Sequence, residues 1–437
     1  MNIAMKLKVR TITLSSIPLI FILFFSLACM TPVLTRHQYK LLFVLGTAWA
    51  FYYYVKEGFS NRISLYVFIA MAWAGLYKLF GVSATALGNV LMVYLYFYIF
   101  LMGLYFYDHA DVWWKQLLVR LNLVWAYINF IDFYFVYKKF PLVNYYMNSI
   151  TPEGDYARSL NFPGSSHVYP FIYLIIILVM MARYEHIAYK KIGWLLLTIA
   201  PFYYIALMQR MTGVMFLLAA FFALIFIVMK KRISEAQRKG LILGTLLFLL
   251  IFSTFFLVPM FYYLGKTISA ERLAVRFTSL AYFLEGDVSR RTYFSGRTSL
   301  VVMDLKSWLS GPISFAFGIG RDDQPYIGGH QPFFDALASY GVVGLVFLSN
   351  LYWRYYQKYI RPLYSPYVFL CFFLYMLLTF FNGVTECMEA SCIFIFVPSS
   401  VYLIKEYAAG MYPKSNFSER RRGFKYAGTA MAAQIRG

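Results

Sequence analysis

Long apolar runs recur throughout this chain of 437 residues and limit what it can fold into. Runs of about 17–22 such residues are long enough, as helices, to cover the ~30 Å hydrocarbon core of a bilayer. Only 14% of the residues are charged, against about 25% in a soluble globular domain, because a charge at bilayer depth costs several kcal/mol. The sequence therefore predicts an all-α, polytopic integral membrane protein. We place twelve spans near residues 12–31, 41–55, 63–82, 87–107, 116–137, 168–182, 192–209, 211–229, 240–264, 333–352, 364–382 and 389–404.

The basic residues predict the orientation of these spans. With the N-terminus inside, the cytoplasmic segments carry 24 Lys and Arg and the outer segments 14, and two more fall within spans. This asymmetry follows the positive-inside rule, so both termini are predicted to be cytoplasmic, with a basic tail at 405–437. The net charge of +21 would also suit nucleic-acid binding. Its placement instead favours topology and contact with anionic membrane lipid, and we expect no nucleic-acid partner.

Histidines and cysteines show no spacing typical of a metal site. The five histidines, at positions 37, 109, 167, 186 and 330, are far apart in sequence, so we expect no metal and no cofactor. Cys29 and Cys371 fall within spans and are interpreted as small apolar residues of the core. Cys387 and Cys392 lie near the outer end of the last span. An oxidising compartment would permit a bridge between them, but their spacing alone does not establish one.

A polar segment from Lys266 to His330 interrupts the apolar runs with eight cationic and six acidic residues. It forms most of the larger of two outer loops, 265–332, and the other is 138–167. The connections on the cytoplasmic side are short, and no further domain interrupts the single membrane domain, 1–437. The loop 265–332 is therefore predicted to be the catalytic part of the chain.

Two amphipathic helices are predicted inside the larger loop. The segment ERLAVRFTSLAYFLEGD places Leu273, Phe277, Leu280 and Leu284 at helical spacing, as in a helix at the membrane interface. The segment TSLVVMDLKSWLSGP places Val301, Leu305 and Trp308 on one stripe, and Ser295 is its expected N-cap. A Gly- and Pro-containing turn, SGPISFAFGIG, then leads to His330, just before the tenth span.

A second expected feature is a turn inside the apolar stretch 192–229. As one helix its 38 residues would measure ~57 Å, almost twice the thickness of the bilayer core. The polar pair Gln209-Arg210 marks the expected turn on the outer side. This places Arg210 at the outer mouth of the bundle.

Three residues combine position and chemistry in a way that suggests catalysis. Arg297 follows a Ser-Gly pair at a helix start, where backbone N–H groups and a guanidinium suit phosphate oxygens. Arg210 is a second cation at the same face, and His330 has an imidazole able to accept a hydroxyl proton. Simpler roles fit each residue locally: contact with lipid headgroups for Arg297, snorkelling to the interface for Arg210, and helix capping for His330.

Other polar residues of the two outer loops are candidates for substrate binding. The first loop contributes Arg158 and His167, next to Asn161 and Pro163. The larger loop contributes Ser295, Thr298 and Arg321. Its acidic candidates Glu285, Asp287, Asp304, Asp322 and Asp323 include no convincing carboxylate pair.

The order of these motifs resembles the bacterial O-antigen polymerase and O-antigen ligase superfamily. The resemblance covers roughly residues 155–350 and depends on ARSLNFPGSSH before a span, QRMTGV two spans later, and SGRTSL, FGIG and GHQPFFDALASYGVVGL in and after the large loop. Two positions depart from the family pattern. Gln331 follows His330 where many members have Asn, and Gln209 stands where Ser is usual.

The resemblance implies a metal-independent glycosyltransferase of the bacterial inner membrane, with its active site facing the periplasm. The implied donor is an oligosaccharide on undecaprenyl pyrophosphate. Arg210 and Arg297 would neutralise the leaving pyrophosphate, His330 would deprotonate the acceptor hydroxyl, Arg158 would hold the donor, and the anomeric carbon would be inverted. A chain-length regulator and a flippase are implied partners.

Three functions remain open at this stage. The first is a polymerase that joins lipid-linked repeat units into O-antigen or capsular polysaccharide, as in lipopolysaccharide biosynthesis. The second is a ligase that transfers finished glycan to lipid A–core or to protein, and it shares the donor chemistry. The third is a flippase or other transporter, which usually shows internal repeats or charged residues within its spans. The sequence has no evident repeat, and only Lys78 and Arg120 fall inside predicted spans.

Overall fold

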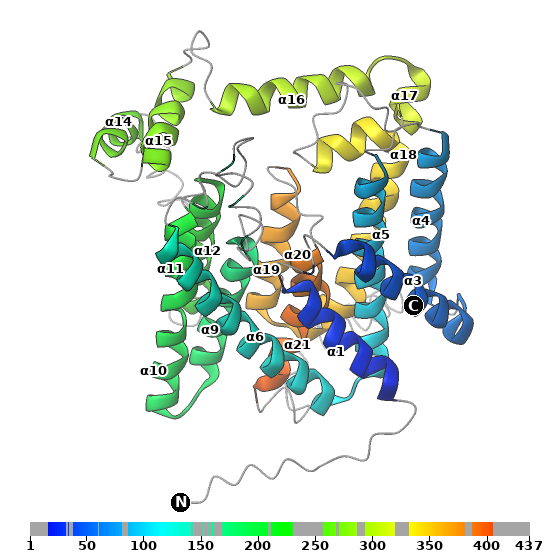
Figure 1. The fold of residues 1–437 in the computed structure, drawn as a ribbon, viewed down its shortest axis with the longest axis horizontal. Helices are drawn as coiled ribbons and strands as arrows, with labels where there is room; N and C mark the ends of the chain where they lie inside the picture. The colour runs from blue at the N-terminus through cyan, green and yellow to red at the C-terminus, as the bar shows by residue number, and fades with distance from the viewer. Residues whose placement is uncertain are drawn as a thin grey trace, which may run out of the picture.

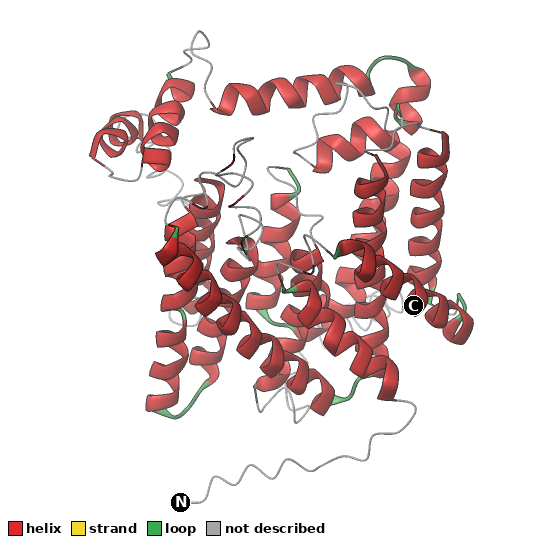
Figure 2. Ribbon diagram, viewed as in Figure 1, coloured by secondary structure: helices red, strands yellow, loops and turns green. Residues whose placement is uncertain are grey.

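The computed structural model describes residues 16–31, 34, 38–59, 61–80, 86–140, 143, 152, 156, 160, 168–208, 211–229, 257–267, 271–285, 293–319, 332–380 and 387–404. Every regular element in these ranges is a helix, and no strand occurs among them (Figure 2). The predicted all-α fold class is confirmed for this part of the chain.

Helices occupy eleven of the twelve segments predicted as spans, and the other segment, 240–264, is described only from residue 257. They pack as one bundle around a continuous apolar core (Figure 1). The bundle comprises α1 (Ile17–Cys29), α3 (Tyr39–Glu57), α4 (Arg62–Phe80), α5 (Ala86–His109), α6 (Val112–Lys139), α9 (Val168–Tyr184), α10 (Ala188–Leu197), α11 (Ile199–Met208), α12 (Met211–Met229), α18 (Pro332–Tyr355) with the short η3 (Tyr356–Ile360) and η4 (Arg361–Leu363), α19 (Pro366–Leu378), α20 (Cys387–Ser391), η5 (Cys392–Phe396), α21 (Val397–Ser400) and η6 (Val401–Leu403).

Two helices among the described residues are long and apolar enough to cross a membrane. They are Ala188–Met208, with 21 residues, and Phe333–Leu363, with 31 residues. Large apolar side chains also point outward from the bundle: Phe51 of α3 is 72% exposed, and α10 buries none of its residues. Exposed apolar surface of this extent marks a face covered by lipid or by another protein. The chain is thus a helical protein with a membrane-compatible surface.

Four helices lie at one end of the bundle, where the polar segment was predicted to form an outer loop. They are α14 (Leu257–Thr267), α15 (Glu271–Leu284), α16 (Tyr293–Trp308) and α17 (Pro312–Phe317). Figure 1 shows α16 lying across this end, while the turn between α9 and α10 lies at the opposite end. We call the end that carries α14–α17 the α16 end.

Helices α14 and α15 form a hairpin with a small apolar core of its own. Phe261 stacks on Phe277 at 5.6 Å between ring centroids, and Ala281 is fully buried beside them. The predicted amphipathic helix is therefore present as α15, and Phe277 faces α14. The predicted span 240–264 is described only from Leu257, and the helix there, α14, runs to Thr267 and belongs to this hairpin.

Helices α11 and α12 flank the polar pair at which the long apolar stretch was predicted to turn. Helix α11 is described to Met208 and α12 from Met211. The predicted turn at residues 209 and 210 lies outside the described residues. An interruption at Thr198 separates α10 from α11.

Helix α18 bends at Gly341, whose backbone has φ 64°. Residues with a Cβ rarely adopt this left-handed conformation. The bend places the residues before Gly341 against α17, where the Ile319 amide donates to the Ala338 carbonyl at 2.9 Å. The start of α18 is thereby held across the α16 end of the bundle.

Candidate functional site

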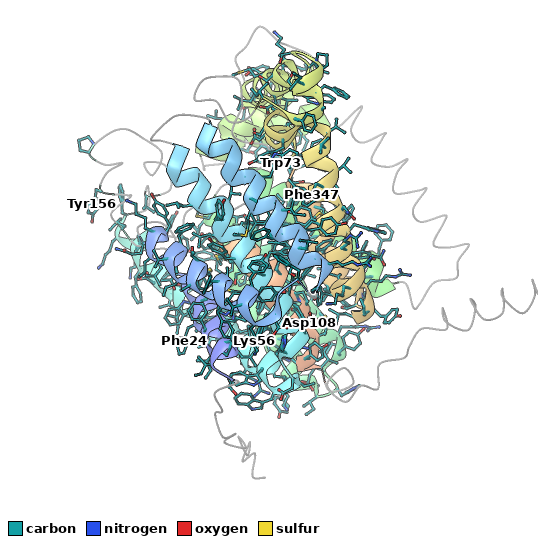
Figure 3. The ribbon with its side chains drawn as sticks, turned by 90° about the vertical axis from the view of Figure 1, so that its right-hand side faces the viewer. Phe24, Lys56, Trp73, Asp108, Tyr156 and Phe347 are labelled. Carbon is teal, nitrogen blue, oxygen red and sulfur yellow. The ribbon has the colours of Figure 1, made fainter. Side chains whose placement is uncertain are left out.

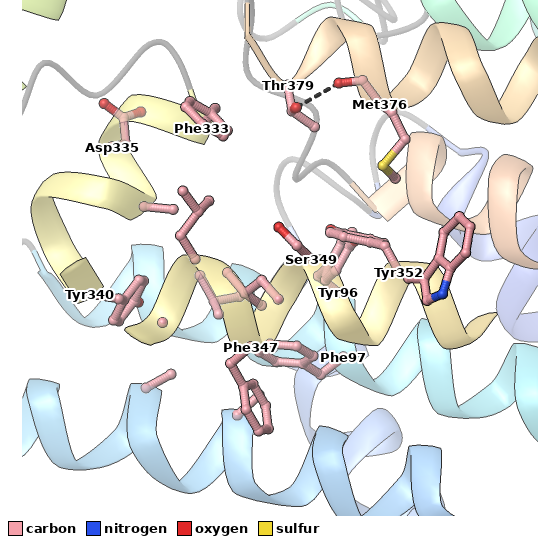
Figure 4. A pocket seen from close by; sticks show the side chains of 18 of the residues that line it. Tyr96, Phe97, Phe333, Asp335, Tyr340, Phe347, Ser349, Tyr352, Met376 and Thr379 are labelled. Carbon is pink, nitrogen blue, oxygen red and sulfur yellow. Dashed lines mark hydrogen bonds between the residues drawn. The ribbon is translucent and has the colours of Figure 1, made fainter. Parts of the chain in front are cut away.

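A groove of about 650 Å³ runs along α18 between α4, α5 and α19. Its walls are mostly aromatic and aliphatic, with Trp73 of α4, Phe97 of α5, Phe347 of α18 and Phe373 of α19 among them. Figure 4 shows Phe97 and Phe347 on one wall and Phe333 and Thr379 at the end of the groove. Segments far apart in sequence line it, so the groove exists only in the folded bundle.

The groove reaches the α16 end of the bundle, where α18 is anchored to the end of α19. The Phe333 amide donates to the Thr379 carbonyl at 2.9 Å, and the Phe333 ring stacks on Phe380 at 4.3 Å. Asp335 also lines the groove here, in the first turn of α18 (Figure 4). We call this end, with Phe333, Asp335, Thr379 and Phe380, the groove mouth.

Tyrosine hydroxyls form a polar contact halfway along the apolar wall. The Tyr96 hydroxyl hydrogen-bonds to the hydroxyl of Tyr352 and, at 2.7 Å, to that of Tyr375. Tyr96 and Tyr352 line the groove, whereas Tyr375 is fully buried behind them. Each hydroxyl has another hydroxyl as its hydrogen-bond partner, which a buried polar group needs. The contact therefore links α5, α18 and α19.

The opposite end of the bundle carries a second polar cluster. Asp108 accepts hydrogen bonds at 3.0 Å from the Lys358 ammonium and from the Tyr359 hydroxyl. Figure 3 shows Asp108 and Lys56 at this end and Trp73 and Phe347 nearer the other. Burial lowers the pKa of Lys115, while Asp108 and Asp111 act to raise it. This cluster joins the ends of α5, α6 and η3 and lies away from the groove mouth.

Arg297, one of the predicted catalytic residues, lies on α16 and hence at the α16 end of the bundle. The backbone of Arg297 lies in the second turn of α16, seven residues before Asp304, so both positions fall on the same face. Asp304 and Ser307 are buried on that face, and α16 packs against α18. Val301, Leu305 and Trp308, predicted as its apolar stripe, are only half-buried.

Three of the eight predicted site residues, Ser295, Arg297 and Thr298, lie on α16, where their backbone positions are described. Ser295 is not the N-cap, because α16 begins two residues earlier, at Tyr293. The other five lie outside the described residues: Arg158, His167, Arg210, Arg321 and His330. The helix that follows His330 begins at Pro332, close to the predicted position.

The structure describes the side chains of three of the four cysteines. Cys29 and Cys371 are fully buried and belong to the core as expected. Cys392 is a buried thiol that forms no disulfide, so the bridge between Cys387 and Cys392 is absent. Among the described residues, no group of three or more His, Cys, Asp or Glu could hold a metal ion.

Sequence reasoning missed two acidic residues that the fold places in distinctive positions. Asp335 lies at the groove mouth, and Glu389 of α20 is fully buried in the bundle. Glu389 interacts electrostatically with Tyr173 of α9, Tyr375 of α19 and Cys392 of η5. Each lies at the start of a predicted span, and an acidic residue at such a position could have marked it as a candidate functional residue.

Comparison with known proteins identifies no relative: no family model, curated protein or solved structure matches this chain.

Proposed function

We propose that this protein is a multi-pass inner-membrane polymerase that joins polyprenyl-pyrophosphate-linked repeat units into O-antigen or capsular polysaccharide. One observation carries the proposal: an apolar groove runs along α18 and reaches the start of that helix, at the end of the bundle where α16 and α17 lie. A substrate with a long apolar tail and a charged, sugar-bearing head needs such a site, apolar at membrane depth and polar at the surface.

The length of the groove suits a lipid tail. Beyond the bend at Gly341, its lining on α18 extends from Gly344 to Tyr356 in η3, a helical rise of about 18 Å. That length covers more than half of the ~30 Å hydrocarbon core of a bilayer. Aromatic and aliphatic side chains fill its walls, and burial of an isoprenoid chain against them contributes about 25 cal/mol per Å².

The proposed topology has twelve spans, both termini in the cytoplasm and α14–α17 on the periplasmic face. Helices on eleven of the predicted spans support this arrangement. The clustering of Lys and Arg in the predicted cytoplasmic segments supports the orientation.

The proposed reaction is displacement at the anomeric carbon of the donor. The acceptor hydroxyl oxygen forms a bond to that carbon as its proton passes to the His330 imidazole. The bond from the anomeric carbon to the pyrophosphate oxygen breaks, and its electron pair leaves with the pyrophosphate. Arg210 and Arg297 stabilise the charge that develops there. Arg158, His167, Ser295, Thr298 and Arg321 are proposed to bind the donor.

The test is a surface-polysaccharide gel from a strain that lacks the gene, complemented with wild type, Arg297→Ala or His330→Ala. Arg361→Ala, at the opposite end of the bundle, is the matched control. We expect the wild type and the control to restore the ladder, and the two other variants to leave core with a single repeat. Bare core with accumulated lipid-linked polymer would identify the ligase instead. An unchanged ladder in the deletion strain would reject both functions.

A transporter of lipid-linked oligosaccharide is the second candidate, and Glu389 favours it. Transport proteins place ionisable groups inside the bundle along the substrate path, and Glu389 is fully buried there beside Tyr173 and Tyr375. Flipping of labelled lipid-linked sugar by purified protein in vesicles, without polymer formation, would support this function over polymerisation.

A further inference from the structure

Arg354 is a half-buried cation at the end of the bundle opposite α16, in the long apolar helix Phe333–Leu363. Its guanidinium lies over the Tyr66 ring of α4, 4.8 Å from the ring centroid, and its Nε donates to the Asn350 side-chain oxygen at 3.1 Å. Its Nη2 reaches the Tyr66 hydroxyl at 3.5 Å. The ring and the two neutral acceptors together fix the position of this guanidinium.

These partners leave the charge of Arg354 and most of its donors unmatched. A guanidinium has five N–H donors, and two of them are directed at Asn350 and Tyr66. Among the described residues, Arg354 forms no ion pair with a carboxylate. Because a cation withdrawn from water needs an opposite charge nearby, the site favours an anion from outside the chain.

A second arginine lies on the same face of α4 as Tyr66. Arg62 is exposed at the start of α4, four residues before Tyr66, and residues at this spacing are neighbours on a helix surface. The start of α4 is held against η3, since the Asn61 amide donates to the Tyr359 hydroxyl at 3.3 Å. Arg62 and Arg354 therefore flank Tyr66 from α4 and from α18.

Exposed apolar side chains extend from these arginines toward the middle of the bundle. Leu65 and Ile69 follow on the same face of α4 and are 38% and 39% exposed. Val343 lies three turns before Arg354 on the same face of α18 and is 41% exposed. The helix rises about 16 Å between these two positions, close to the ~15 Å hydrocarbon depth of one leaflet. A ligand at the arginines would thus also meet an apolar surface as long as an acyl chain.

This combination fits a phospholipid with an anionic headgroup. Phosphate oxygens accept the paired N–H bonds of a guanidinium, whereas free phosphate would leave the apolar surface uncovered. A zwitterionic headgroup carries its own cation, which two arginines repel. We propose that Arg62 and Arg354 bind the phosphate of one anionic phospholipid in the leaflet at this end of the bundle, with an acyl chain along Leu65 and Val343. The site lies at the opposite end of the bundle from the groove mouth and does not depend on the proposed reaction.

The test is lipid binding to the purified full-length protein, measured by native mass spectrometry with phosphatidylglycerol and phosphatidylcholine. The wild type is expected to bind one phosphatidylglycerol more tightly than phosphatidylcholine. Arg354→Gln should weaken phosphatidylglycerol binding about tenfold or more, the effect of losing hydrogen bonds between charged groups, and Arg62→Gln should weaken it in the same direction. Lys358→Gln is the matched control, because it removes a cation at the same end that is already paired with Asp108 at 3.0 Å.

Equal affinity of the wild type for the two lipids, or unchanged phosphatidylglycerol binding by Arg354→Gln, overturns the site. An equal loss in Lys358→Gln does so too, because the effect would then follow net charge and not one place. Displacement of phosphatidylglycerol by equimolar inorganic phosphate would show that the acyl chain adds nothing and would reject the lipid. If Arg354→Gln does not fold, Arg62→Gln decides instead, since Arg62 is exposed: binding equal to that of wild type overturns the site.

Discussion

Gly318 and Gly341 lie at one backbone crossing, and neither position has room for a side chain. A Cβ on Gly318 would lie 2.2 Å from the carbonyl carbon of Ser339, and one on Gly341 would lie 2.4 Å from that of Ala316. Both glycines also have positive φ, 79° and 64°. The crossing holds the end of α17 on the bend of α18 and so fixes the start of α18 at the groove mouth.

Replacement of Gly341 by Ala is expected to destabilise the protein by more than backbone strain alone. A non-glycine residue in the left-handed region costs about 1–2 kcal/mol, and here the added Cβ also meets the backbone of α17. The matched control is Gly58→Ala, because Gly58 has φ 58° but nothing within 4 Å of its Cβ position. Thermal unfolding in detergent should show a larger fall in midpoint for Gly341→Ala. Equal falls would mean that the crossing is looser than the structure shows.

The hydroxyl contact among Tyr96, Tyr352 and Tyr375 is expected to show coupled energies. Tyr375→Phe removes the 2.7 Å hydrogen bond to Tyr96, and loss of one such bond costs about 1 kcal/mol. Tyr96→Phe removes the same bond, so the double variant should cost less than the two single changes together. Unfolding of the two single variants and the double variant measures this coupling. Strict additivity would show that the two hydroxyls act independently.

If the protein is the proposed polymerase, filling the groove is expected to abolish polymerisation without unfolding the protein. Ala74 of α4 lines the groove, and Ala74→Phe would occupy space proposed for the lipid tail. Overpacking costs about 1–3 kcal/mol, so the amount of protein in the membrane must be measured beside the polysaccharide ladder. Ala48→Phe, on the exposed side of α3, is the control. A full ladder from Ala74→Phe at normal protein levels would exclude the groove as the tail site.

The helices could be predicted from the sequence because their signals are local. Apolar runs of span length placed α18 close to its observed start. A turn inside the stretch 192–229 could be predicted from length alone, since one straight helix would exceed the bilayer. Ser295 was misplaced because helix ends depend on capping contacts that periodicity does not reveal.

The groove could not be predicted, because its walls come from four helices separated by up to several hundred residues. Phe333 and Phe380 meet only after α18 and α19 have packed. Asp335 reads in sequence as an ordinary helix-start acid, and its position at the mouth becomes visible only with the bend at Gly341. Which distant segments pack together depends on the tertiary fold, so the residue pattern of one segment does not predict it.

Replacement of Glu389 is expected to distinguish a structural role of this residue from a role in transport. It is fully buried, and it interacts electrostatically with Tyr173, Tyr375 and Cys392. A buried charge costs several kcal/mol, so Glu389→Gln, which keeps size and polarity without a charge, should unfold within about 1 kcal/mol of wild type. Glu389→Lys should fail to accumulate, because it imposes a cation at the same place. If the protein is a polymerase, Glu389→Gln should retain the polysaccharide ladder in the complemented strain. Loss of the ladder by a stable Glu389→Gln variant would instead make this carboxyl part of the working path and favour the transporter.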